Sequence, residues 1–515
     1  MQNDRASPRP SSAVLNHLNQ GLLTSYEPHN PVKSQRLTRF SIICGMIAAI
    51  APLQFGYKLS ELNIIKDAII NCDNPLTSSG FNWSLPKCLP MDENYFALAT
   101  SIFALGGLVG SLFAGYLSDR FGRKRVLLYN SIIFLIGATI QAFSLNAASL
   151  IFGRFVSGIS SGTAIVITPI YLTEIAPIHA RGTLNLFNQM SIVIGLLLAQ
   201  IIGYFFETGN RWRMVFIISM LLSLVNFGTM FLIVESPKYL YYQSNIAQAE
   251  VVLQKLRNNN DVREEIESWE NPSQNNASTS SNENMYETRI SESELPSSNI
   301  LLPERNINLI NIFGIRKYRQ PIFLVVCLQL GQQATGISAV VFYSTSIFKE
   351  IYSSKTSAIL TLVFGIVNLV MTIFAINIIE QIPRKKLLLS SIIAMFISML
   401  IFVISSFQQL KIMVVISLFM VIASFAPGFG PLPFLLSTEL FDTKALGAGN
   451  SISISTNWIG TFISGVTFFG LQNAIGNYVF VIYMGLMVIF AIIYIFYLPE
   501  TKNKTFEKVS EDFVF

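Results

Sequence analysis

Long apolar stretches alternate with short polar ones along most of the chain. Each stretch has few charges and runs for about eighteen residues or more, the length that a helix needs to cross roughly 30 Å of hydrocarbon. Six stretches precede a polar segment and six follow it, and each predicts a membrane-spanning helix. The predicted spans are 39–57, 95–117, 126–145, 149–172, 185–207, 213–234, 321–347, 358–380, 386–406, 411–437, 446–470 and 477–498.

Polar residues fill the segments outside these spans. In the polar segment between the two sets, residues 245–269 favour short helices. Residues 271–299 are rich in Ser, Asn, Glu and Pro and are expected to be disordered, because they cannot bury enough apolar surface to fold. The predicted organisation is a cytoplasmic N-terminal tail (1–38), a six-helix bundle (39–234), a cytoplasmic linker (235–317), a second six-helix bundle (318–498) and a cytoplasmic C-terminal tail (499–515).

Composition and charge agree with a lipid environment. Of the 515 residues 51% are hydrophobic and 13% are charged, too few charges for a soluble domain. The net charge of +5 is small and scattered, which argues against nucleic acid as a partner. Arg and Lys concentrate on the flanks that face the cytoplasm if both termini are cytoplasmic, as the positive-inside rule requires. Residues 1–38 lack a cleavable signal pattern, so the first span is expected to act as a signal anchor.

The loop formed by residues 66–93 would then face the outside. It contains Cys72 and Cys88, and two cysteines in one loop of an oxidising compartment favour a disulfide. Asn82 begins an Asn-Trp-Ser glycosylation sequon in the same loop, although so short a motif also occurs by chance. The loop is therefore predicted to carry a disulfide and a candidate glycan.

The two sets of spans carry similar charged clusters at equivalent places. Residues 119–124, after the second span, read Asp-Arg-Phe-Gly-Arg-Lys, and residues 380–385, after the eighth, read Glu-Gln-Ile-Pro-Arg-Lys. Glu174 follows the fourth span and Glu439 follows the tenth. This correspondence indicates an internal duplication.

Further motifs make the chain similar to the sugar porter family of the major facilitator superfamily, from about residue 39 to 507. The resemblance implies an all-α membrane protein of the major facilitator fold, with twelve helices in two six-helix bundles. It also implies a monomeric transporter that binds a small sugar and needs no cofactor. The segments that carry the resemblance are 115–124, 154–158, 169–177 with Arg181 and Gly182, 235–240, 332–337 and 499–502.

Charged residues at the ends of the spans are expected to form ion pairs between helices. Such charges also serve as topology signals, but in the sugar porters they form a network that closes the cytoplasmic side in one state and breaks in the other. In the second half, Gln381, Pro383 and Leu446 replace the family's Arg, Gly and Arg, so the second network is expected to be weaker. The predicted gating residues are Asp119, Arg120, Arg123, Arg154, Glu174, Arg181, Glu235, Glu439 and Arg384.

Several spans contain amide side chains, which offer both hydrogen-bond donors and acceptors. A single polar side chain in a span can simply pair with a neighbouring helix, but a cluster matches the hydroxyl groups of a sugar. The resemblance assigns these positions, with aromatic neighbours, to hexose binding. The predicted substrate-binding residues are Gln189, Gln332, Gln333, Ser338, Asn368, Phe434, Asn457 and Trp458.

Some of these positions depart from the family pattern, so the cavity is expected to differ in shape and glucose is not assumed. Each departure shortens a side chain or removes a hydrogen-bonding group. The departures are Ser338 for Asn, Phe342 for Tyr, Phe434 for Trp and Thr461 for Asn.

Lys58 follows a Phe-Gly-Tyr run where proton-coupled relatives carry Asp. A free lysine titrates near pH 10.4, so Lys58 is poorly suited to carry a proton. Lys58 can instead pair with Glu61, three residues on. Transport is therefore expected to be facilitative. Symport through another carboxylate, such as Glu174 or Glu439, is the alternative.

Two other functional classes are less favoured. A non-transporting nutrient sensor on the same scaffold would carry a long cytoplasmic tail, which this chain lacks after its last span. The three histidines have no metal-ligand spacing and no nucleophile–base motif is present, so neither a metal site nor an enzyme is expected. The plasma membrane and a vacuolar or other endomembrane both fit as the site of residence.

Overall fold

The computed structural model describes residues 37–70, 85–177, 180–207, 209–270, 311–442, 444–502, 504 and 506–513. Within these ranges all regular elements are helices. Ten of the described segments are long and apolar enough to cross a membrane. One of them, 446–497, contains two helices, and 411–425 is a further, shorter apolar helix. The arrangement agrees with the predicted fold of twelve spans.

The first bundle contains six long rods and one short helix. Its first rod is interrupted at Ala49, between α2 and α3. Helices α5 and α7 pack closely at Gly106. A Cβ on this residue would lie 2.1 Å from the Phe155 carbonyl oxygen and would clash with it, so the close approach of the two helices requires glycine here. The helices are α2 (Arg39–Ala48), α3 (Ile50–Ser60), α4 (Lys66–Ile70), α5 (Glu93–Phe121), α6 (Arg123–Ala142), α7 (Ala147–Ile175), α8 (Arg181–Phe206) and α9 (Arg213–Thr229).

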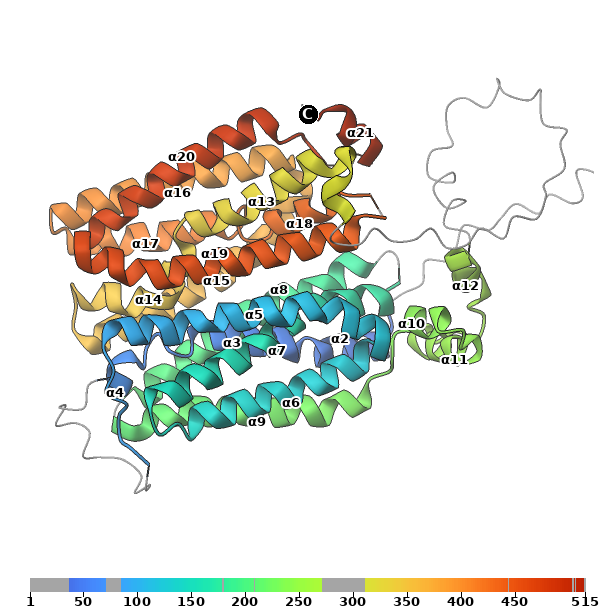
Figure 1. Cartoon of the computed structure of the whole chain (residues 1–515), viewed down its shortest axis with the longest axis horizontal. Helices are drawn as coiled ribbons and strands as arrows, with labels where there is room; N and C mark the ends of the chain where they lie inside the picture. Colours follow the sequence, from blue (N-terminus) through green and yellow to red (C-terminus); the bar gives the residue numbers. More distant parts are fainter. Residues whose placement is uncertain are drawn as a thin grey trace, which may run out of the picture.

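Three short helices of the linker lie against one end of the first bundle (Figure 1). They are α10 (Pro237–Tyr242), α11 (Ile246–Arg257) and α12 (Arg263–Glu270). Helices α11 and α12 fall where short helices were predicted, and α10 precedes that stretch. Arg257 fixes them, since it donates to the Ile175 carbonyl at the end of α7 (2.7 Å) and pairs with Glu265 (2.7 Å). The stretch predicted to be disordered lies outside the described residues.

The second bundle differs from the prediction in two of its spans, which are interrupted. Span 321–347 breaks before Gly336, whose φ of +72° lies in the left-handed region that favours glycine. Span 411–437 breaks between α17 and α18, where Pro427 and Pro431 cannot donate a helical hydrogen bond. The helices are α13 (Arg319–Ala334), α14 (Ile337–Lys349), α15 (Ser354–Gln381), α16 (Arg384–Phe407), α17 (Lys411–Phe425), α18 (Leu432–Glu439), α19 (Leu446–Ile475), α20 (Val479–Tyr497) and α21 (Phe506–Glu511).

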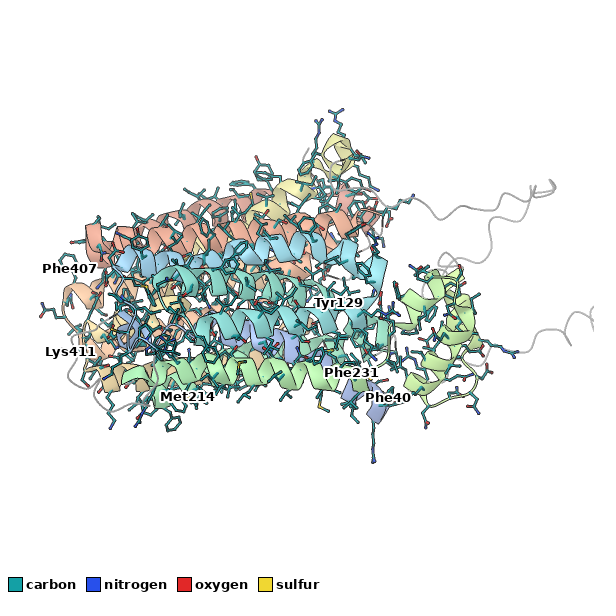
Figure 2. All side chains as sticks on the ribbon, turned by 60° about the horizontal axis from the view of Figure 1, so that its bottom comes forward. Phe40, Tyr129, Met214, Phe231, Phe407 and Lys411 are labelled. Atoms are coloured by element: carbon teal, nitrogen blue, oxygen red, sulfur yellow. The ribbon has the colours of Figure 1, made fainter. Side chains whose placement is uncertain are left out.

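The two bundles lie side by side with their long axes roughly parallel (Figure 1). Helices α5 and α8 of the first bundle face α19 and α15 of the second. Large apolar side chains such as Phe231 and Phe407 are exposed on the outside (Figure 2), as expected for a surface that contacts lipid. The face between the bundles is therefore the place where a polar cavity can form.

Candidate functional site

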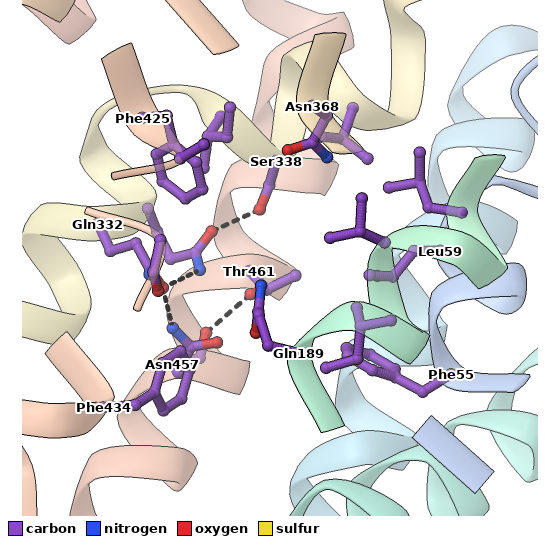
Figure 3. Close-up of a pocket in the computed structure, with 18 of the residues that line it drawn as sticks. Phe55, Leu59, Gln189, Gln332, Ser338, Asn368, Phe425, Phe434, Asn457 and Thr461 are labelled. Atoms are coloured by element: carbon purple, nitrogen blue, oxygen red, sulfur yellow. Dashed lines mark hydrogen bonds between the residues drawn. The ribbon is translucent and has the colours of Figure 1, made fainter. Parts of the chain in front are cut away.

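A cavity of about 1090 Å³, its opening included, lies between the two bundles (Figure 3). The first bundle contributes an apolar wall, which includes Phe55, Leu59 and Ile192, with Gln189 as its amide. The second bundle contributes the other amides and hydroxyls. All eight residues predicted to bind substrate line the cavity: Gln189, Gln332, Gln333, Ser338, Asn368, Phe434, Asn457 and Trp458.

Gln332 joins the two interrupted spans of the second bundle. Its Nε2 donates to the Phe429 carbonyl (2.5 Å) and to the Gly430 carbonyl (3.1 Å), which are exposed by the break between α17 and α18. Its Oε1 accepts from Asn457 Nδ2 (2.6 Å), which also donates to Gln329 Oε1 (2.8 Å). Because its amide is fully engaged within the protein, Gln332 holds the shape of this wall. Sequence reasoning missed Gln329, which lies one turn earlier on α13.

Two other amides line the cavity without such partners. Within the part of the chain that the structure describes, the side chains of Gln189 and Asn368 make no hydrogen bond to protein, and both lie at the cavity wall. Gln189 comes from α8 in the first bundle and Asn368 from α15 in the second. A bound molecule could therefore hydrogen-bond to both bundles at once.

Three aromatic rings meet across the interface at one side of the cavity. Trp458, from α19, lies edge-on to Phe55 and Phe103, with ring centroids 5.8 and 5.9 Å apart. A Cβ on Gly107 would lie 2.6 Å from the Trp458 ring, so only glycine leaves room for it on α5. The packing gives the cavity an aromatic wall that both bundles share.

Polar contacts join the two bundles at the end that carries α4. Asn63 donates to the Val341 carbonyl (3.0 Å) and to Ser344 Oγ (2.7 Å), and it accepts from the Thr345 N–H (3.2 Å). Lys349 pairs with Asp67 at 2.6 Å. These contacts close the α4 end of the interface.

At the linker end, the predicted gating residues of the first half pair within their own bundle. Arg123 contacts Glu174 (Nε–Oε2, 3.0 Å) and Asp119 (Nη1–Oδ1, 3.2 Å). Glu235 accepts from the Lys124 N–H at 2.9 Å, and burial raises the pKa of Glu235 although such N–H donors lower it. Arg120 is exposed and donates instead to the Tyr116 hydroxyl.

The remaining gating residues, except Arg154, lie at the same end. Burial lowers the pKa of Lys238, and the nearby positive charge of Arg181 lowers it further. In the second half, Arg384 Nε lies 3.4 Å from Glu439 Oε1. Glu500, which sequence reasoning did not single out as a gating residue, accepts a hydrogen bond from the backbone N–H of Arg384 at 2.8 Å. Glu235 accepts from the backbone N–H of Lys124 in the same way in the first half.

Arg154 differs from the prediction that placed it in this network. It is fully buried near the start of α7, roughly 30 Å along the helix from Glu174. Its Nη1 contacts Glu61 Oε1 (2.9 Å), and Lys58 Nζ contacts the other oxygen, Oε2 (2.8 Å). The predicted pairing of Lys58 with Glu61 is thus confirmed. We call Lys58, Glu61 and Arg154 the buried triad.

The predicted disulfide and glycan fall largely outside the described residues. Cys88 is disulfide-bonded, whereas Cys72 and Asn82 lie in the segment 71–84 that the structure does not describe.

Comparison with known proteins agrees with this architecture. The model of the family "Sugar (and other) transporter" matches residues 44–513. The probable metabolite transport protein YBR241C of Saccharomyces cerevisiae is 29% identical, over 91% of this chain and 94% of its own length. The human "Solute carrier family 2, facilitated glucose transporter member 4" is 30% identical, over 93% of this chain and 92% of its own.

Solved structures with the same fold include the xylose transporter XylE of E. coli. Its inward-open conformation superposes with a TM-score of 0.72 at 21% identity, covering 92% of this chain and all 100% of XylE. A partially occluded inward-open form gives a TM-score of 0.70 at 22% identity, covering 91% of this chain and 100% of XylE. XylE is a major facilitator superfamily protein. The chain has this fold, and it belongs to the sugar (and other) transporter family.

Proposed function

We propose that the protein carries a hexose or a related monosaccharide or polyol across a membrane by facilitated diffusion. The observation that carries the proposal is the cavity between the bundles, where amides from several helices face one space. Amides both donate and accept, as the hydroxyl groups of a sugar require. The Trp458 ring adds an aromatic face for the C–H surface of the sugar. Relatives whose names describe facilitated glucose transport support this substrate class.

Alternating access is the mechanism that suits such a cavity. The site lies between two bundles that resemble each other, and contacts through Asn63 and Lys349 close the interface at the α4 end. Rocking one bundle against the other breaks these contacts and opens that end. The substrate site would then face first one side of the membrane and then the other.

Facilitated diffusion, rather than proton coupling, is supported by the buried triad. All three side chains are fully buried, and Glu61 is the carboxylate that faces both cations. A proton on Glu61 would leave Lys58 and Arg154 buried without a compensating charge, which is strongly unfavourable. Glu174 and Glu439 each lie in an arginine pair. Each of these carboxylates thus already has a cationic partner.

The test is uptake into proteoliposomes from a panel of labelled monosaccharides and polyols. At least one should enter saturably and only equilibrate, with or without an imposed pH gradient. Accumulation above equilibrium that a protonophore collapses would instead establish the symport alternative. Binding without any uptake would establish a nutrient sensor.

Variants of the cavity sharpen this test. Gln189→Ala and Asn368→Ala should each reduce kcat/KM by about tenfold, because a sugar hydroxyl loses its partner. Gln332→Ala should abolish uptake, since it also frees the Phe429 and Gly430 carbonyls. Gln408→Ala, in an exposed loop, is the matched control and should behave as wild type. Unchanged uptake in all three cavity variants would contradict the proposed site.

The orientation is proposed from the charge distribution. We place the linker end and both termini in the cytoplasm, because Arg and Lys concentrate there. The protein is proposed to work as a monomer, in the plasma membrane or in a vacuolar or other endomembrane. Protease accessibility of the linker in sealed vesicles of known orientation tests the sidedness, and fluorescent tagging tests the residence.

A further inference from the structure

One hydroxyl group on α16 lies directly against the break between α17 and α18. Ser391 is 4% exposed, and its Oγ donates to the Ser424 carbonyl (2.7 Å) and accepts from the Phe429 N–H (3.3 Å). Ser424 belongs to the last turn of α17, whereas Phe429 lies within the break. A single side chain of a neighbouring helix thus bridges the start of the interruption.

The two backbone groups that this hydroxyl contacts are groups that the break deprives of helical partners. In a regular helix the Ser424 carbonyl would accept from the N–H of Gly428, and the Phe429 N–H would donate to the Phe425 carbonyl. In the structure the N–H groups of Gly428 and Gly430 both donate to the Phe425 carbonyl instead (3.3 and 3.0 Å). Because a buried backbone group without a partner costs free energy, the serine hydroxyl stabilises the break in this form.

Close packing brings the hydroxyl to the main chain. A Cβ on Gly428 would lie 2.2 Å from the Cβ of Ser391 and would clash with it. Glycine therefore lets the break lie directly on α16, where even the short side chain of a serine reaches main-chain atoms.

The same segment of backbone carries the acceptors of Gln332. Phe429 is held at both of its main-chain groups, because its N–H donates to Ser391 and its carbonyl accepts from Gln332 Nε2 (2.5 Å). The Gly430 carbonyl accepts from the same amide (3.1 Å), and Gln332 Oε1 accepts from Asn457. The contacts therefore run without interruption from Ser391, which lies outside the cavity, to the amides that line it (Figure 3).

We propose that Ser391 is a positioning residue for the substrate site, because its hydroxyl fixes the break whose carbonyls orient Gln332. This inference rests on the proposed function. Ser391 acts through the main chain of Phe429 and does not touch the substrate. Without the hydroxyl, the break shifts to find other partners for its two released groups, and the Gln332 amide shifts with it. The site then binds its sugar more weakly, whereas the contacts that close the interface at the α4 end are unchanged.

The test compares KM and kcat for sugar uptake by Ser391→Ala and by the wild type in proteoliposomes. Ser391→Ala should raise KM by about tenfold, since two buried backbone groups lose their partner and Gln332 loses its fixed acceptors. The kcat should stay within about twofold of wild type. The Kd, measured as thermal stabilisation of the purified protein by the same sugar, should rise together with KM.

Ser398→Ala is the matched control. Ser398 is also buried on α16, but its hydroxyl donates to the Ala394 carbonyl of its own helix (2.7 Å). Its removal deprives no group outside α16 of a partner, so KM should stay within about twofold of wild type. A tenfold rise of KM in both variants would refute a specific role of the hydroxyl at the break.

The possible outcomes separate this inference from the proposed function. If the wild type transports a sugar and Ser391→Ala keeps its KM and Kd, even with a lower Tm, the positioning role is refuted and the transport function stands. If the wild type neither binds nor transports any monosaccharide or polyol, both fall.

A second variant keeps the test decisive if Ser391→Ala does not yield folded protein. Ser391→Cys places a weaker donor and acceptor against the same two backbone groups. Its KM should rise by about threefold, with kcat again near that of the wild type. A wild-type KM in Ser391→Cys would then refute the role of the hydroxyl.

Discussion

One arrangement of charged residues occurs once in each bundle, at the linker end. Helix α6 begins at Arg123 and helix α16 begins at Arg384, and each arginine side chain contacts a glutamate near the end of the fourth span of its bundle. In both bundles a second glutamate accepts hydrogen bonds from N–H groups of the first helical turn, where the helix dipole favours a negative charge. The corresponding glutamates are Glu174 and Glu235 in the first bundle, and Glu439 and Glu500 in the second.

The two copies differ in the number and the length of the contacts between the arginine and its acidic partners. Arg123 reaches Glu174 through two nitrogens, at 3.0 and 3.1 Å, and contacts Asp119 as well. Arg384 reaches Glu439 through one nitrogen at 3.4 Å, and Thr501 donates to the other oxygen of Glu439. Equal charges therefore do not give equal ion pairs, because the shorter separations between Arg123 and Glu174 strengthen their attraction.

The turn before each arginine also differs between the two bundles. Gly122 has a φ of +93°, and a Cβ at this position would lie 2.5 Å from Glu235 Oε2. Pro383 occupies the equivalent place with φ −56°. The glycine leaves room for Glu235 beside the turn, whereas the proline ring fixes φ, and we infer that this difference lengthens the contact of Arg384 with Glu439.

The largest effect is expected from Arg123→Ala. It leaves the carboxylate of Glu174, only 13% exposed, without its cation, and breaking a largely buried pair costs about 3 kcal/mol, enough to slow a coupled step more than tenfold. Initial uptake rates at matched expression measure this loss. Arg120→Ala removes a charge from an exposed neighbour and should leave the rate within about twofold of wild type.

A smaller effect is expected from Arg384→Ala. Only one long contact to Glu439 is lost, and Thr501 remains as a partner, so the uptake rate should fall by about threefold. The same assay and the same normalisation apply. Losses of equal size in Arg123→Ala and Arg384→Ala would show that the two networks are equivalent in transport.

The smallest effect is expected from Pro383→Gly. If the proline limits the second pair, glycine should increase the coupling energy between Arg384 and Glu439 by about 0.5 kcal/mol. Double-mutant cycles on thermal unfolding, run in the wild-type and Pro383→Gly backgrounds, measure that coupling. A coupling that stays the same or decreases would mean that the turn is not the cause of the difference.

The sequence predicted the architecture well because lipid imposes a simple rule on helix length and composition. It also predicted which residues line the cavity, since the family resemblance assigns polar and aromatic positions within the spans, such as Gln189, Asn368 and Trp458, to sugar binding. The breaks at Gly336 and at residues 426–431 were missed, because apolar residues continue through both and keep the hydropathy high.

Arg154 was misplaced for a different reason. The prediction places all charged residues of the family motifs in one network, although motifs at the start and at the end of one helix lie on opposite sides of the membrane. Helix α7 begins at Ala147, so Arg154 lies near its start and Glu174 near its end. Its partner Glu61 could be recognised only as a neighbour of Lys58, because sequence spacing does not show which face of α3 meets α7. Contacts between helices decide such pairs.

The unequal walls of the cavity have a consequence for the speed of the transport cycle. Hydrogen bonds lose strength steeply when they are bent, whereas contacts between apolar surfaces tolerate sliding. Phe55, Leu59 and Ile192 can thus move past a sugar that stays bound to the second bundle, and only the contact to Gln189 has to be exchanged. The apolar wall should then add little to the barrier that the loaded carrier crosses, and most of the barrier that the sugar adds should come from exchanging its bond to Gln189.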